Sequence, residues 1–145
     1  MENMTEPIPK RRVIIAGGRD ITDYDLVLHA IEQSRFQIDV VVSGGASGVD
    51  SLGERFAEES DLDLTIFRAD WQTYGRAAGP IRNRKMAENA DALIAVWDGK
   101  SRGTKNMIET ATKLGLHVYV HRTDMDRLAT LEEAEEFARK RNYPL

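Results

Sequence analysis

The 145-residue sequence contains no cysteine and only three histidines, His29, His117 and His121. Without cysteine, the chain cannot form a disulfide scaffold, a thiolate nucleophile or a cysteine-ligated zinc or iron–sulfur site. The histidines fall in neither an H-E-x-x-H nor an H-x-E pairing, so we expect no metal site and no cofactor. No apolar run approaches the roughly 20 residues that a membrane-spanning helix needs, so we expect no membrane partner.

The first twelve residues are polar, include two prolines and lack the apolar segment of a signal peptide, which predicts a cytoplasmic location. The whole chain has 20 basic and 24 acidic residues, a net charge of −4. This acidic balance disfavours nucleic acid as a partner, because such binding depends mainly on neutralising phosphates. Residues 76–105 are different, with seven basic and three acidic residues. That window predicts either a local anion site or charges scattered over a helix and two loops.

Five apolar runs rich in β-branched residues indicate strands, at residues 13–16, 40–43, 64–67, 92–97 and 117–120. The runs are continuously apolar rather than alternating, which is typical of parallel strands buried on both faces. Helical patterns lie between them. The alternation predicts an α/β fold, a doubly wound sheet of about five parallel strands flanked by helices.

Capping and turn residues place the ends of these helices. Thr22 or Asp23 can cap the first, and Ser47 or Asp50 can open the second. Pro80 suits the first turn of the third. Thr104 opens the fourth, with Met107, Ile108, Ala111 and Leu114 facing inward, and Gly115 closes it.

The length fits a single domain, which we assign to residues 1–145. Its first ten residues are expected to form a loose tail. Residues 126–145 are expected to form a C-terminal helix and tail, because Leu128, Leu131, Ala134 and Ala138 follow helical spacing.

Glycine-rich turns follow three of the predicted strands, at residues 17–18, 43–48 and 99–104. Ligands of open parallel sheets bind beyond the carboxyl ends of the strands, where the winding direction reverses. Glycine allows backbone N–H groups to approach an anion, and a following helix adds its N-terminal dipole. Although neither the P-loop pattern nor G-x-G-x-x-G is present, the turns together predict a phosphate cradle.

These turns carry a resemblance to a known superfamily. Residues 43–50, Ser-Gly-Gly-Ala-Ser-Gly-Val-Asp, resemble the S-G-G-A-x-G-[IV]-D turn of the SLOG proteins, which include DprA/Smf and the LOG phosphoribohydrolases. Residues 69–71, 79–83, 90–92 and 97–104 resemble the small YspA-type, YpsA-related SLOG proteins more closely. The resemblance covers residues 13–120. It implies a Rossmann-like sheet, a nucleotide-derived ligand, and self-association as a dimer or tetramer.

Together, the glycine turns and the resemblance predict a set of ligand-binding residues. They are Gly17, Gly18, Arg19, Ser43, Gly44, Gly45, Ala46, Gly48, Asp50, Asp70, Trp71, Arg82, Asn83, Gly99, Ser101, Arg102, Gly103 and Thr104. Simpler roles stay open for several of them. Arg19 and Arg82 could be solvated surface residues, Asp50 and Thr104 could be helix caps, and Trp71 could either stack on a base or cover the sheet edge.

The resemblance also bears on catalysis. LOG enzymes carry a catalytic glutamate in P-G-G-x-G-T-x-x-E, and the corresponding position here is Met107. Glu109 lies two residues further along, about 200° around a helix, and should point away from the pocket. Arg82 falls where LOG enzymes carry their catalytic arginine. The resemblance therefore implies that Arg82 contacts a ligand phosphate or ribose, while the missing glutamate favours a protein without LOG-type catalysis.

Three functions remain as hypotheses. The first is binding of a nucleotide or NAD-derived nucleotide, of the nucleoside monophosphate, ADP-ribose or cyclic ADP-ribose type, for sensing or sequestration, including a phage protein that traps a signal. The second is a nucleotide hydrolase in which Asp50, Asp70 or Asp98 acts as the acid or base. The third is a DprA-like DNA-handling module, which the net negative charge disfavours.

Overall fold

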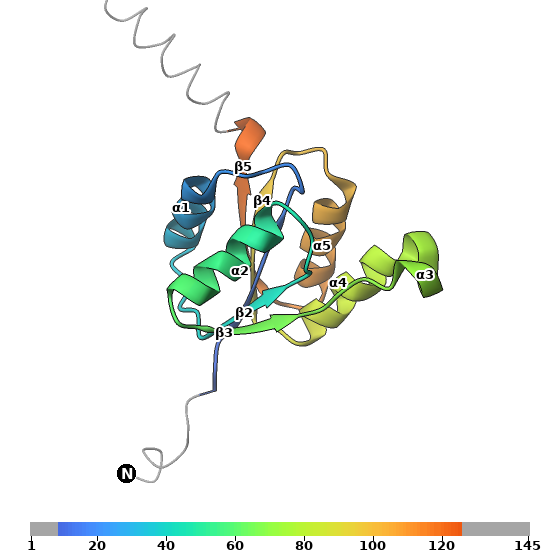
Figure 1. Ribbon diagram of the computed structural model, residues 1–145, viewed down its shortest axis with the longest axis horizontal. Coiled ribbons are helices and arrows are strands. Elements are labelled where there is room, and N and C mark those ends of the chain that lie inside the picture. Colours follow the sequence, from blue (N-terminus) through green and yellow to red (C-terminus); the bar gives the residue numbers. More distant parts are fainter. Residues whose placement is uncertain (1–8, 126–145) are drawn as a thin grey trace, which may run out of the picture.

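The computed structural model describes residues 9–125 as an α/β fold (Figure 1). Its five strands are β1 (Arg12–Gly17), β2 (Val40–Ser43), β3 (Asp63–Ile66), β4 (Ala92–Trp97) and β5 (His117–Arg122). All neighbouring strands pair in parallel, in the order β3-β2-β1-β4-β5. This arrangement confirms the predicted doubly wound, Rossmann-like sheet. The helix predicted within residues 126–145 and most of the N-terminal tail lie outside the described residues.

Helices cover both faces of the sheet. They are α1 (Tyr24–Ser34), α2 (Val49–Glu59), α3 (Trp71–Tyr74), the 3₁₀ turn η2 (Gly75–Ala77), α4 (Ala78–Glu88) and α5 (Arg102–Lys113). Helices α1 and α2 lie on one face and α4 and α5 on the other, while α3 projects beyond the body at the start of α4 (Figure 1). Within residues 9–125, no helix combines the length and apolar character that crossing a bilayer requires.

The central strands supply a separate apolar core to each face. Val13 and Ile15 of β1 pack towards α1 and α2, whereas Ile14 and Ala16 pack towards α4 and α5. Burial on both faces, expected of a parallel sheet, is confirmed for β1, β2 and β4. The prediction was wrong for β3, where all four residues are exposed. As the last strand at one edge, β3 has a neighbour on one side only.

The helix starts correct several capping assignments. Asp23 caps α1, accepting a hydrogen bond from the Leu26 N–H at 3.3 Å. The expected caps were wrong for α2 and α5. Ser101 caps α5, and Thr104 lies in the first turn of that helix. Neither Ser47 nor Asp50 caps α2: Gly48 is the N-cap residue, and the N–H of Val49 donates to the Gly18 carbonyl at 3.1 Å.

The far end of α5 departs from the predicted inward face. Met107 and Ala111 are buried and Ile108 is half-buried, as the helical spacing predicts. Leu114 is exposed, because it lies beyond the last helical residue as the C-cap. Gly115 follows it with φ +81°, which fits its predicted role in closing the helix.

The start of α2 touches the end of β1 backbone to backbone. Gly48 precedes α2 with φ +74°, and a Cβ there would lie 2.2 Å from the Gly18 carbonyl oxygen and 2.5 Å from Arg19 backbone atoms. An L side chain is disfavoured at this φ and has no space in this contact. Glycine at 48 therefore holds two of the predicted glycine turns together.

We expect Gly48→Ala to lower the free energy of unfolding by about 2–4 kcal/mol, because it combines a positive φ with a collision against backbone. Gly103→Ala is the matched control, since a Cβ at Gly103 meets nothing within 4 Å. The control should leave stability unchanged or raise it by up to about 1 kcal/mol, as alanine favours helix. Denaturant unfolding of both variants measures the difference, and equal stability would contradict the proposed contact.

Candidate ligand-binding site

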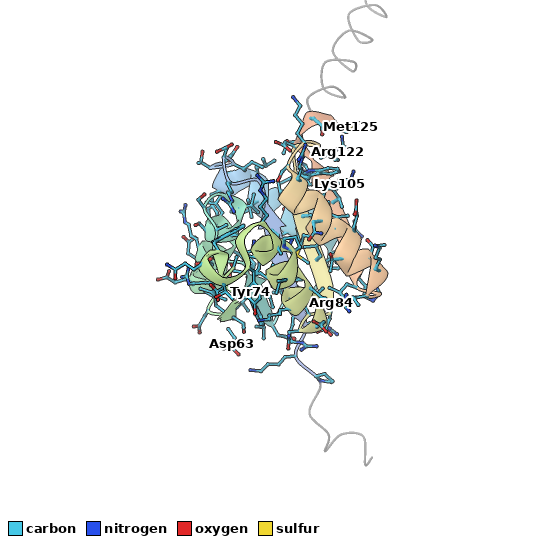
Figure 2. The ribbon with its side chains drawn as sticks, turned by 90° about the vertical axis from the view of Figure 1, so that its right-hand side faces the viewer. Asp63, Tyr74, Arg84, Lys105, Arg122 and Met125 are labelled. Carbon is cyan, nitrogen blue, oxygen red and sulfur yellow. The ribbon has the colours of Figure 1, made fainter. Side chains whose placement is uncertain are left out.

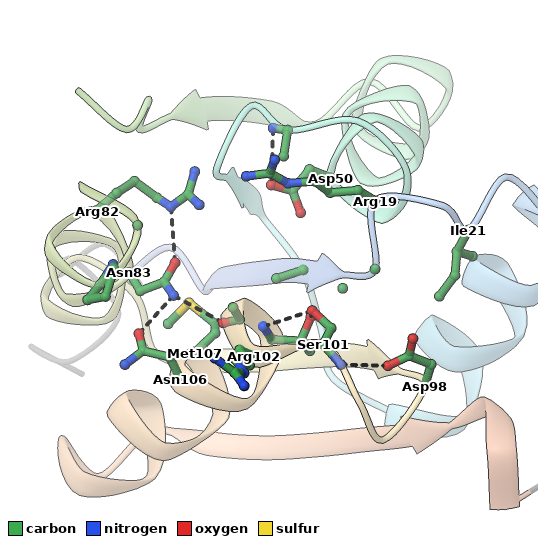
Figure 3. Close-up of a pocket in the computed structure, with 18 of the residues that line it drawn as sticks. Arg19, Ile21, Asp50, Arg82, Asn83, Asp98, Ser101, Arg102, Asn106 and Met107 are labelled. Atoms are coloured by element: carbon green, nitrogen blue, oxygen red, sulfur yellow. Dashed lines mark hydrogen bonds between the residues drawn. The ribbon is translucent and has the colours of Figure 1, made fainter. Parts of the chain in front are cut away.

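A cavity of about 650 Å³ opens between the carboxyl ends of β1 and β4 (Figure 3). This is where the strand order reverses, the usual ligand position in an open parallel sheet. Its lining comprises Ala16, Gly17, Gly18, Arg19, Asp20, Ile21, Ala46, Asp50, Trp71, Arg76, Gly79, Pro80, Arg82, Asn83, Met86, Asp98, Lys100, Ser101, Arg102, Gly103, Thr104, Asn106 and Met107. We call it the main cavity.

A smaller cavity of about 300 Å³ adjoins the main cavity on the side of β2 and β3. Its lining comprises Arg19, Gly44, Gly45, Ala46, Ser47, Arg68, Ala69, Trp71 and Arg82. We call it the side cavity. Because Arg19, Ala46, Trp71 and Arg82 line both, the two cavities share a wall.

The loop between β4 and α5 forms one wall of the main cavity and is held by its own hydrogen bonds. Asp98 Oδ1 accepts from the N–H groups of Lys100 and Ser101, both at 2.8 Å. These bonds, first that of Ser101, hold the pKa of Asp98 below its usual range. The Trp97 indole donates to the Ser101 carbonyl at 3.0 Å. The hydroxyls of Ser101 and Thr104 lie 3.0 Å apart at the start of α5.

Asp50 is a buried carboxylate in the main cavity, with 5% of its surface exposed. Burial raises its pKa, opposed first by the hydrogen bond from the Ala46 N–H to Oδ2 at 3.2 Å and then by the Arg82 charge. A Cβ at Gly44 would lie 2.7 Å from Asp50 Oδ2 and 2.6 Å from Arg82 Nη1. The missing side chain at Gly44 thus leaves room for these two opposite charges.

Arg82 is held from two sides. Its Nη1 donates to the Gly44 carbonyl at 2.6 Å, and its Nε donates to Asn83 Oδ1 at 3.0 Å. Asn83 is buried, and its amide nitrogen donates to the Gly103 carbonyl at 3.3 Å and to Asn106 Oδ1 at 3.0 Å (Figure 3). Asn83 therefore ties α4 to the start of α5 and orients Arg82 at the shared wall.

The position of the LOG glutamate is occupied by an apolar side chain. Met107 is 1% exposed and lines the main cavity. Glu109 lines neither cavity and forms an exposed ion pair with Lys105 at 3.9 Å. Glu109 therefore points away from the cavity, as its spacing along the helix predicts.

Most of the predicted ligand-binding residues come together around the two cavities. The main cavity is lined by Gly17, Gly18, Arg19, Ala46, Asp50, Trp71, Arg82, Asn83, Ser101, Arg102, Gly103 and Thr104. Gly44 and Gly45 line the side cavity.

Four predicted residues line neither cavity, and each has a structural contact instead. Ser43 Oγ donates to Glu54 at 2.7 Å, and Asp70 Oδ1 caps α3 by accepting from the Thr73 N–H at 3.1 Å. Gly48 contacts the end of β1, as described above. Gly99 has φ +82° and leaves room for the Arg122–Asp124 ion pair behind the loop.

Sequence reasoning missed several lining residues. Arg76 and Lys100 lie in the basic window 76–105, so the charge count was a usable signal for them. Arg68 lies outside that window, next to the exposed strand β3, and carried no signal. Gly79 belongs to the 79–83 motif of the family resemblance, which was a usable signal for it, whereas no sequence signal pointed to Asp20, Ile21 or Asn106.

The strand order and the site at its reversal define this molecule as a Rossmann-like α/β protein. The chain belongs to the YspA, cpYpsA-related SLOG family, YAcAr, whose profile matches residues 11–74. It is 35% identical over 118 residues to the "Gene 61 protein" of Mycobacterium phage D29, an alignment that covers 74% of this chain and 94% of the phage protein. These findings confirm the resemblance in the sequence.

A solved structure shares the fold. The X-ray structure of DNA processing protein A (DprA) from Streptococcus pneumoniae superposes with a TM-score of 0.59 at 18% sequence identity. The likeness covers 77% of this chain and half of the DprA chain. At this level of identity, the likeness bears on the Rossmann-like architecture alone.

Asp50 should give stability a defined pH dependence. Its folded-state pKa lies above its ordinary value of 3.8, so the folded protein binds this proton more tightly than the unfolded chain does. The contribution of Asp50 is fully present below pH 3.8 and is lost as the pH rises through the folded-state pKa. We expect the unfolding free energy of the unmodified protein, minus that of Asp50→Asn, to fall across this window and then to level off.

Denaturant unfolding of both proteins at a series of pH values measures this difference, in which contributions from other titrating groups largely cancel. A difference that rises with pH would mean that the Arg82 charge outweighs burial and lowers the pKa of Asp50.

Proposed function

We propose that this protein binds a nucleotide or an NAD-derived nucleotide, of the nucleoside monophosphate, ADP-ribose or cyclic ADP-ribose type, and that it serves sensing or sequestration. The observation that carries the proposal is the main cavity itself, a glycine-lined crevice with more basic than acidic side chains. The basic ones are Arg19, Arg76, Arg82, Lys100 and Arg102, and the acidic ones are Asp20, Asp50 and Asp98.

The start of α5 supports a phosphate position. Ser101 and Thr104 place two hydroxyls there, and Gly103 leaves the backbone open, because a Cβ at this glycine would meet nothing within 4 Å. The N-terminal dipole of a helix and its N–H groups favour an anion at such a point. Arg102 lines the same wall and can pair with phosphate oxygens.

The opposite wall suits the nucleoside. Trp71 is 50% exposed and lines the cavity, which leaves its ring available to stack on a base. The Arg19 guanidinium lies 5.8 Å from the centre of that ring. Asp50 can accept a hydrogen bond from a ribose hydroxyl when it is ionised.

Retention of the ligand, rather than its turnover, is supported by the groups near the start of α5. N-glycosidic cleavage needs a proton donor or a general base close to the bond, and the thioether of Met107 can be neither. Asp98 is committed to the loop and has a lowered pKa. The version in which a signalling nucleotide is trapped would place the protein in a phage, and the chain is similar to a mycobacteriophage protein.

One observation favours a hydrolase as the second candidate. Asp50 lies in the main cavity, and its raised pKa would keep a proton on the carboxyl to higher pH, as a general acid requires. Asp70 is outside both cavities, and its hydrogen bonds with Thr73 lower its pKa. Of the three aspartates considered as the acid or base of a hydrolase, Asp50 is therefore the one that remains a candidate. DNA handling of the DprA kind rests on the shared fold and on no residue of this site.

Binding is tested by titrating the protein with AMP, GMP, ADP-ribose and cyclic ADP-ribose. We expect at least one micromolar or tighter ligand, and stabilisation of about 2.7 kcal/mol at a hundredfold excess over Kd. Arg82→Ala and Arg102→Ala should each weaken binding by about 1.5–3 kcal/mol, the usual size of a charge-assisted hydrogen bond. Calorimetry and thermal unfolding provide the two measurements.

Arg84→Ala is the matched control, because Arg84 lies on the outer side of α4, pairs with Glu88 at 3.9 Å and lines neither cavity (Figure 2). The control should bind as tightly as the unmodified protein. If neither these compounds nor a cellular nucleotide extract raises the melting temperature, the binding proposal is wrong.

Turnover is tested by incubating the same nucleotides with a high concentration of protein and separating the products by chromatography. We expect each nucleotide to be recovered unchanged, because no proton donor replaces the LOG glutamate at Met107. Release of free base or ribose 5-phosphate that disappears in Asp50→Asn would replace the binding proposal with the hydrolase.

A further inference from the structure

The side cavity is more basic in composition than the main cavity. Its nine lining residues include three arginines, Arg19, Arg68 and Arg82, and no carboxylate. The remaining residues are Trp71 and the small residues Gly44, Gly45, Ala46, Ser47 and Ala69. Three permanent positive charges thus face a hollow of about 300 Å³ that is lined by no compensating charge.

Two of these arginines are held by consecutive carbonyl groups of the glycine turn. Arg82 Nη1 donates to the Gly44 carbonyl at 2.6 Å, and Arg68 Nη1 donates to the Gly45 carbonyl at 3.5 Å. The second bond is long and therefore weak, so Arg68 can turn towards a stronger acceptor. Both guanidinium groups keep further N–H donors for an oxyanion.

Among the described residues, the three charges have no ion-pair partner. Within residues 9–125, no carboxylate forms an ion pair with Arg19, Arg68 or Arg82. Burial lowers the pKa of Arg82, and the negative charge of Asp50 opposes that effect. The Arg19 charge also lowers this pKa, which indicates that the two like charges interact. Repulsion between nearby like charges is relieved when an anion binds among them.

The wall between the cavities contains an aromatic ring. Trp71 lines both cavities, with Arg19 over its ring at 5.8 Å and half of its own surface exposed. A base or ribose placed against Trp71 would have the start of α5 on one side and the Gly44-Gly45 turn on the other. One nucleoside unit would then separate two anion positions.

We propose that the side cavity is a second phosphate subsite, and that the ligand is a nucleotide with two separated phosphate groups, one in each cavity. This inference rests on the proposed nucleotide binding and narrows the ligand to a nucleotide class other than the monophosphate and ADP-ribose types named in the broader proposal. Arg68 contacts the second phosphate alone, whereas Arg82 at the shared wall serves both. Ligands of this class include nucleoside 3′,5′-bisphosphates and 5′-phosphorylated dinucleotides.

The test compares three probes by titration calorimetry at one ionic strength: a nucleoside 5′-monophosphate, the 5′-diphosphate and the 3′,5′-bisphosphate, each with adenine and with guanine. The 5′-diphosphate controls for added charge, because its phosphates are contiguous. We expect the bisphosphate to bind roughly tenfold more tightly than either of the others, the gain of one charge-assisted contact. Arg68→Ala should remove that gain and change monophosphate binding by less than about twofold, while Arg84→Ala should retain it.

The outcomes separate the two proposals. Equal affinity for the bisphosphate and the 5′-diphosphate, or an undiminished bisphosphate preference in Arg68→Ala, overturns the second subsite while nucleotide binding stands. Absence of binding by every probe and by the compounds of the broader panel overturns both. An unchanged melting temperature of unliganded Arg68→Ala would show that the exposed Arg68 side chain acts on the ligand and not on the fold.

Discussion

The site depends on one close backbone contact. The end of β1 lies directly between β4 and the start of α2. A Cβ at Gly17 would lie 2.2 Å from the Val96 carbonyl oxygen, so no side chain fits there. Gly18 N donates to that same carbonyl at 3.3 Å, and its own oxygen accepts from Val49 N at 3.1 Å. The three backbone segments therefore pack directly against each other. A side chain at this junction would push the glycine turns apart and fill the crevice between them.

A second constraint runs through side chains on the other face of the sheet. Asn83 joins α4 to the start of α5 and holds Arg82, which reaches the Gly44 carbonyl beside Asp50. The hydrogen bonds orient the guanidinium without neutralising it. Asp50 opposes the effect of burial on the pKa of Arg82, but it forms no ion pair with Arg82 among the described residues. The charge thus remains available to a ligand at a fixed place.

The sequence pattern predicted the central strands best, because burial on both faces leaves a continuous apolar run. Strand β4 begins and ends at the predicted residues, and β2 does as well. The pattern failed at the edge, where the equally apolar Leu64 and Ile66 are exposed. Hydrophobicity along a chain does not record how many neighbours a strand acquires, which is a property of the whole sheet.

The limits of the site prediction have a similar cause. The glycine turns and the basic window identified the main cavity, since a turn after a parallel strand has a known place in the fold. Arg68 could not be found this way, because its role depends on the distance between β3 and the neighbouring glycine turn. Ser43 and Asp70 matched the family pattern, yet their hydrogen bonds to Glu54 and Thr73 give them structural roles.

The charged groups that suit this site to anion binding also lower the stability of the unliganded fold, and the proposed ligand would offset that loss. The half-buried charge of Arg82, which has no ion-pair partner among the described residues, and the buried carboxylate of Asp50 each disfavour the folded state on their own. Both line the same cavity as Met107, a buried apolar side chain at the position where LOG enzymes hold their acid. An anionic ligand would supply the missing negative charge and meet no proton donor at that wall. Under the proposed function, the ligand would therefore stabilise the folded protein, and its chemical integrity would follow from the absence of an acid at Met107.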